Sequence, residues 1–139
     1  MVTFPGVEVR VPLGEFAGAT SPLRPPTALR LLDISLDADA ELLMPVPAGH
    51  NAFVLPISGT LSVDGQVASS DGSPVPITVA KPHAHEIRLE ATKGAAKVAL
   101  FSGEPLNQPV YWDGPMALAS PEALADAMAA FRRGDFGKL

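Results

Sequence analysis

The sequence predicts an all-β fold, a sandwich or barrel of short antiparallel strands followed by one C-terminal helix. First, 15 Pro and 12 Gly are spread along the 139 residues and divide the chain into many short segments. Second, apolar residues in these segments alternate with polar ones or form short runs, as they do in strands. Third, 47% of the residues are hydrophobic, which is enough for the core of one domain of this length.

The N-terminal part of the chain predicts strands on either side of a loop. Valines at every second position of residues 7–11 alternate with charged residues, which predicts a strand with one buried face. Glycine and proline interrupt residues 17–27, so we expect a loop there, because proline lacks the backbone N–H that a strand needs. Strands are predicted again over residues 29–36 and 40–46.

Residues 52–57 form an apolar run bounded by Gly49 and Gly59. Such a run is typical of a strand that is buried on both faces between two layers. Pro56 lies within it and cannot donate a backbone hydrogen bond, so we expect it at a sheet edge or at a β-bulge.

Asp64 and Gly65 separate two further β-like segments, residues 60–63 and 66–67. Asp-Gly is a strong signal of a two-residue hairpin, because both turn positions need a positive φ. The remaining strands are predicted over residues 77–80, 85–90 and 97–102.

The last predicted element is a helix over residues 121–133. Ser120 can cap its free N–H groups, Pro121 suits its first position, and Gly134 can adopt the left-handed conformation that ends it. One side of the helix carries an apolar stripe that we expect to pack on the β layers, made of Leu124, Met128 and Phe131.

Composition excludes several classes of function. The chain has 10 Lys and Arg against 15 Asp and Glu, with one Trp and one Tyr, so it offers no basic, aromatic surface for direct nucleic-acid binding. No apolar run approaches the about 20 residues of a membrane span, and the first residues lack a signal-peptide pattern, so we expect a cytoplasmic protein that does not bind membranes. Without Cys, any metal site would need His and carboxylate ligands.

Three segments of the chain resemble the pirin family. Residues 103–115, Gly-Glu-Pro-Leu-Asn-Gln-Pro-Val-Tyr-Trp-Asp-Gly-Pro, and the closing Arg-Arg-Gly-Asp-Phe-Gly at 132–137 are similar to the end of pirins. Pro-Ala-Gly-His-Asn-Ala-Phe-Val at 47–54 resembles the middle of the C-terminal domain of the same family. The resemblance implies one cupin-like domain over residues 1–139, a double-stranded antiparallel β-barrel of jelly-roll type. Its barrel would span about residues 6–115 and its helix about residues 121–133.

The resemblance also carries expectations about function. Pirins consist of two cupin barrels in tandem, and their iron site belongs to the N-terminal barrel, which has no counterpart in this chain. At the positions where a cupin metal motif would fall, the chain has Ala52 and, earlier, Pro45 and Pro47 or Val46 and Ala48, none of which can bind a metal. We therefore expect a metal-free module without catalytic residues. An unpaired barrel of this kind would expose an apolar patch, so we expect a homodimer or pairing with a separate metal-binding cupin chain.

Two other functions stay open. His83 and His85 lie two residues apart, as ligands on one face of a strand would, and with His50 they could hold Fe, Mn or Ni in a small dioxygenase acting on a phenolic or enolisable substrate. Alternatively, the barrel is a metal-free pocket for a small ligand such as a sugar or an organic acid. In that case Arg30 or Arg88 would be the anchor for an anion.

Overall fold

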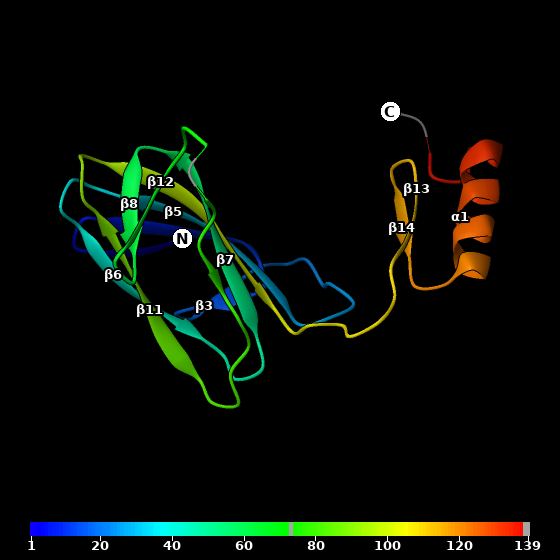
Figure 1. The fold of residues 1–139 in the computed structure, drawn as a ribbon. Coiled ribbons are helices and arrows are strands. Elements are labelled where there is room, and N and C mark those ends of the chain that lie inside the picture. The colour runs from blue at the N-terminus through cyan, green and yellow to red at the C-terminus, as the bar shows by residue number, and fades with distance from the viewer. Residues whose placement is uncertain (73, 138–139) are drawn as a thin grey trace. The chain divides into compact units, whose positions relative to one another are not determined.

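A computed structural model describes residues 1–72 and 74–137 of the chain, which divides into two compact units, Met1–Pro105 and Leu106–Leu139. The first unit is built on two antiparallel sheets (Figure 1). The larger sheet has the strand order β1 (Val2–Phe4), β2 (Val7–Leu13), β5 (Leu29–Leu36), β12 (Ala96–Gly103), β7 (Asn51–Ser58), β10 (Ile77–Thr78). The smaller sheet has the order β6 (Glu41–Val46), β11 (His85–Ala91), β8 (Thr60–Val63), β9 (Gln66–Ser69).

A short hairpin of β3 (Glu15–Phe16) and β4 (Ala19–Thr20) follows β2. Strand β4 lies inside the segment predicted as a loop, and the proline-rich part of that segment, residues 22–26, contains no strand. The predicted strands over residues 29–36, 40–46, 60–63, 85–90 and 97–102 match β5, β6, β8, β11 and β12 to within one residue at each end.

The two sheets share one apolar core. Buried side chains come from every second position of the central strands of each sheet, as the alternation in the sequence predicts. They include Leu32, Ile34, Val54, Val98 and Leu100 from the larger sheet and Leu42, Met44, Leu61, Ile87 and Leu89 from the smaller one. The all-β fold predicted from the sequence is confirmed.

Strand β7 differs from its prediction. Only one face of the strand is buried, with Ala52 at 2% and Val54 at 1% exposure. On the other face Phe53, Leu55 and Ile57 are exposed by 40%, 38% and 51%. The prediction that both faces are buried is wrong, because within the first unit only one sheet packs against the larger sheet, on its inner face.

Two local predictions are confirmed. Residues Val98 and Lys97 pair with Pro56 and Ser58, so Ile57 has no opposite residue and forms a bulge next to the proline. The Asp64-Gly65 turn joins β8 to β9, with φ of 49° and 84° at its two residues.

The second unit consists of one hairpin and one helix. Strands β13 (Tyr111–Asp113) and β14 (Met116–Leu118) pair with each other, and α1 (Pro121–Arg133) packs against them. The predicted helix bounds are confirmed: Ser120 Oγ accepts a 3.1 Å hydrogen bond from the Ala123 amide, and Gly134 ends the helix with φ of 79°. Nowhere in residues 1–72 and 74–137 is there a helix of the length and apolarity needed to cross a membrane.

The barrel strands end earlier than predicted. The last strand of the two main sheets, β12, ends at Gly103 rather than near residue 115. Pro105 and Pro109 follow it, and because proline cannot donate to a strand ladder, residues 104–110 contain no strand. The hairpin that comes next belongs to the second unit, and a single domain over residues 1–139 stays a prediction.

Candidate functional site

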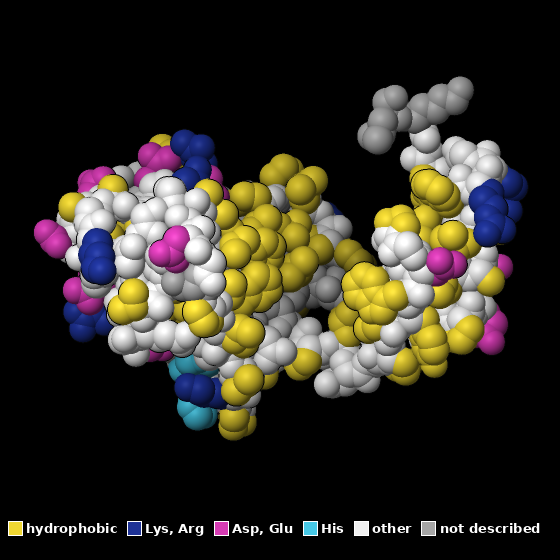
Figure 2. Space-filling view, turned by 45° about the horizontal axis from the view of Figure 1, so that its top comes forward, with side chains coloured by type: hydrophobic (Ala, Val, Ile, Leu, Met, Phe, Trp, Pro, Cys, Tyr) yellow, Lys and Arg dark blue, Asp and Glu magenta, His cyan; other side chains and the backbone are white. Residues whose placement is uncertain are grey.

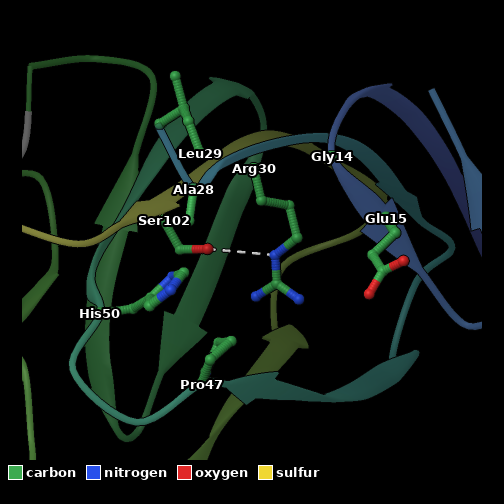
Figure 3. Close-up of a pocket in the computed structure, with 8 residues that line it drawn as sticks. All are labelled: Gly14, Glu15, Ala28, Leu29, Arg30, Pro47, His50 and Ser102. Carbon is green, nitrogen blue, oxygen red and sulfur yellow. Dashed lines mark hydrogen bonds between the residues drawn. The ribbon is translucent and has the colours of Figure 1, made fainter. Parts of the chain in front are cut away.

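A cavity of about 270 Å³ lies where β5 begins, β12 ends and β7 begins (Figure 3). The residues that line it include Glu15, Leu29, Arg30, Pro47, His50 and Ser102. Strand alternation positions the polar groups, because Arg30 lies two residues before the buried Leu32 and points to the same inner side. Arg30 and Ser102 are direct partners in the register of β5 and β12.

The Arg30 guanidinium is held by one bond to each sheet. Its Nε donates to Ser102 Oγ at 3.1 Å, and its Nη2 donates to the Pro45 carbonyl of β6 at 2.7 Å. Among the described residues no carboxylate lies within 4 Å of it. Burial without a counter-ion disfavours the charged form, so the pKa of Arg30 lies below its ordinary value.

The other predicted anion anchor, Arg88, has a different setting. It lies on the outer face of β11, exposed, and forms ion pairs with Glu41 and, at 3.9 Å, with Glu90. Its charge is already neutralised by its neighbours. Of the two candidate arginines, Arg30 lines the cavity described above, whereas Arg88 is paired with carboxylates.

The three histidines do not form one ligand set. His83 lies in the bend before β11 and is exposed, because the strand and its alternation begin only at His85. His85 is half-buried with both ring nitrogens buried and unpaired, and His50 lines the cavity with its Nδ1 buried and unpaired. His83 therefore lies outside the strand on which both histidines were predicted to lie. Within the described parts of the chain, no three His, Cys, Asp or Glu side chains are grouped so that they could hold one metal ion.

A second candidate region is the outer face of the larger sheet. Phe101 pairs across the sheet with Leu31 on one side and Phe53 on the other, and Phe53 pairs with Ile77 of β10. The rings of Phe53 and Phe101 stack with centroids 4.6 Å apart and planes 11° apart. Figure 2 shows hydrophobic side chains gathered on one face of the first unit. We call the set Leu31, Phe53, Leu55, Ile57 and Phe101 the apolar face.

The sequence predicted an apolar patch without locating it. Three residues of the apolar face, Phe53, Leu55 and Ile57, belong to the run that was predicted to be buried on both faces. Ser102 was not singled out, because its partner Arg30 is 72 positions away and only the strand register brings the two together. A lone serine in an apolar strand carries no local signal of such a contact.

Two antiparallel sheets of six and four strands around a shared core are the architecture of a cupin. A solved structure agrees: the quercetin 2,3-dioxygenase from Acinetobacter baumannii superimposes with a TM-score of 0.79 at 27% identity, over 96% of this chain and 45% of that one. The model of the pirin C-terminal cupin domain matches residues 31–137. The chain therefore belongs to the pirin family, as a C-terminal cupin domain, and the resemblance stated above is confirmed.

Curated relatives give the same family. Pirin of Rattus norvegicus is 30% identical over 95% of this chain and 45% of its own length. Pirin-like protein 2 of Arabidopsis thaliana is 31% identical over 81% of this chain and 36% of its own. The chain thus spans less than half the length of each of these relatives.

Proposed function

We propose that this chain is an interaction module, a metal-free pirin C-terminal-type cupin that packs its apolar face against another cupin barrel. The partner is a second copy of the chain or a separate metal-binding cupin chain. The observation that carries the proposal is the exposed apolar face of a sheet whose inner face already fills the core. Contiguous exposed apolar patches on folded domains are typical of protein interfaces.

The surroundings of the apolar face support this proposal. Lys97 and Asp33 form a 3.3 Å ion pair on the same side of the sheet, next to Ala99 and Leu55 in the strand register. Glu8 and Arg10 form a second pair on β2. An apolar centre with a charged rim is the usual composition of an interface.

The length of the relatives also supports it. The chain corresponds to less than half of each relative reported above, so each of them has a further half beyond the matched region. The family resemblance implies two barrels in tandem, in which one barrel covers a face of the other. A second cupin barrel is therefore the partner that we propose.

Sedimentation equilibrium of the chain tests self-association. We expect a dimer at about 100 µM protein that dissociates on dilution. Leu55→Lys places a charge in the centre of the apolar face and should weaken the dimer at least about tenfold. The matched control is Leu43→Lys, because Leu43 is 51% exposed on the outer face of β6 and should change the dimer less than about twofold.

Two results would count against self-association through the apolar face. One is a monomeric wild-type chain at about 100 µM, and the other is equal weakening of the dimer by Leu55→Lys and Leu43→Lys. Pairing with a separate metal-binding cupin is tested in the same way, by adding such a chain. A mixed species should then form with the wild type and not with Leu55→Lys.

The alternative is a dioxygenase that uses Fe, Mn or Ni, and the similarity to the quercetin 2,3-dioxygenase from Acinetobacter baumannii favours it. Cupin sites need several ligands on one metal, and the described residues group no three suitable side chains. Mass spectrometry of protein purified without a His tag or chelator tests this alternative. We expect well below about a tenth of an equivalent of metal per chain. About one equivalent in the wild type that is lost when His83→Ala and His85→Ala are combined would favour the enzyme instead.

A further inference from the structure

The cavity beside Arg30 presents a fixed cation with no carboxylate within 4 Å in residues 1–72 and 74–137. A guanidinium has five N–H donors, and the two hydrogen bonds of Arg30, to Ser102 and Pro45, use two of them. These two bonds fix the orientation of the group between the sheets. Figure 3 shows the outer nitrogens projecting between His50 and Glu15. Unused donors of Arg30 are therefore available to a molecule in the cavity.

Two neighbouring side chains add polar groups at the same place. Ser102 is 2% exposed, and because its Oγ accepts from Arg30, its own O–H is left as a donor. His50 lines the same cavity with its Nδ1 buried and without a hydrogen-bond partner. Buried polar atoms are usually satisfied, so an unpaired one in a cavity wall suggests a missing partner.

The rest of the lining limits what the cavity can hold. Leu29 and Pro47 provide apolar walls, and about 270 Å³ is at the small end of the range for ligand sites. Glu15 lies across the cavity from His50 and carries a negative charge. This carboxylate opposes a second negative charge on the same ligand. The lining thus favours one anionic group joined to a small apolar body.

We propose that this cavity binds a small organic monocarboxylate. The ligand carboxylate lies on the Arg30 guanidinium, with the Ser102 hydroxyl and His50 Nδ1 as further partners, and its apolar part lies against Leu29 and Pro47. A planar guanidinium matches a carboxylate in a two-point contact. An inorganic oxyanion can make the same contact but has no apolar part to lie against Leu29 and Pro47. None of the five residues of the apolar face lines this cavity, and the proposal does not depend on self-association.

Titration of the ¹⁵N-labelled chain with sodium benzoate and with sodium pyruvate, followed by NMR, tests the proposal. Saturable shifts of the Arg30 Nε–H signal and of the amides around the cavity are expected below about 20 mM ligand. Sulfate at the same ionic strength should bind at least about fivefold more weakly, and succinate should bind more weakly than benzoate. Glu15→Gln should reduce the difference in affinity between succinate and benzoate, because it removes the negative charge that opposes the second carboxylate of succinate.

Variants locate the binding on Arg30. Arg30→Gln should weaken benzoate binding at least about tenfold, whereas the matched control Arg88→Gln, on the outer face of β11, should leave it unchanged. Ser102→Ala removes a donor but keeps the charge, and should weaken binding about threefold even if Arg30→Gln fails to fold. The proposal is overturned if neither carboxylate gives saturable shifts, if sulfate competes equally, or if Ser102→Ala and a folded Arg30→Gln bind like the wild type.

Discussion

The two sheets of the first unit have similar inner faces and different outer faces. Both inner faces are filled by buried Leu, Ile and Val, and Met44 is added on the smaller sheet. The outer face of the smaller sheet carries charged side chains, namely Glu41, Glu86, Arg88 and Glu90. The larger sheet carries the apolar face in the corresponding place.

This difference separates what the fold needs from what a partner needs. A sheet with one face in the core tolerates polar residues on the other face, as the smaller sheet shows with the Arg88 to Glu41 ion pair. Exposed Phe53, Leu55 and Ile57 add nothing to the core and raise the risk of aggregation. The proposed partner accounts for their presence, and the predictions below compare the two kinds of face.

The largest expected effect compares two leucines on opposite faces of the larger sheet. Leu100 is fully buried, so Leu100→Ala should lower the free energy of unfolding by about 2 to 5 kcal/mol. Leu55→Ala on the outer face should lower it by about 0.5 kcal/mol or less when the protein is dilute. Urea denaturation followed by circular dichroism measures both.

Protein concentration sharpens this comparison. If the apolar face forms a dimer, the cost of Leu55→Ala should increase with protein concentration, and that of Leu100→Ala should stay nearly constant. A Leu55→Ala cost that does not depend on concentration would contradict self-association through this face.

The inner faces of the sheets, the Asp64-Gly65 turn and the ends of the helix were predictable because each depends on a local pattern. Such a pattern involves a few consecutive residues with one favoured backbone conformation, as in the alternation over residues 7–11 and the helix caps Ser120 and Gly134. The outer face was not predictable in the same way. The apolar run over residues 52–57 predicts a strand with two covered faces. The sequence does not show whether the second face is covered by the same domain or by a partner.

The candidate site shows the same limit. Arg30 was singled out as one of two possible anchors, and only the register of β5 against β12 shows that it bonds to Ser102 rather than to a carboxylate. His83 was placed on the face of His85 because the spacing fits a strand. The strand begins at His85, and this boundary could not be fixed from the sequence.

The second prediction concerns Gly59, where the chain passes from β7 of the larger sheet to β8 of the smaller one. Its φ is +76°, and a Cβ there would lie 2.4 Å from the Ala95 carbonyl oxygen. Gly59→Ala should cost about 2 to 4 kcal/mol, because backbone strain adds to a clash with backbone atoms. The measurement is again urea denaturation.

Gly65→Ala is the matched control for this prediction. Gly65 has a φ of +84° but no neighbour within 4 Å, so its replacement should cost only the strain, about 1 kcal/mol. If Gly59→Ala and Gly65→Ala lower the free energy of unfolding equally, close packing where the two sheets join does not contribute to stability.

The third prediction uses salt to compare the faces. If the dimer forms through the apolar face, its dissociation constant should differ less than about threefold between low and high salt, because hydrophobic burial is not screened. Sedimentation in about 50 and 500 mM NaCl measures it. A dimer that weakens steeply with salt would place the contact on a charged surface such as that of the smaller sheet.

The smallest effect is expected on the charged outer face. Arg88→Gln removes the ion pairs with Glu41 and Glu90, all exposed, and should lower the free energy of unfolding by less than about 1 kcal/mol. The loss should shrink further in high salt, because exposed pairs are screened. The same variant should leave the dimer intact, since Arg88 lies on the sheet opposite the apolar face. A weaker dimer in Arg88→Gln, measured by sedimentation beside Leu55→Lys, would move the interface to the smaller sheet.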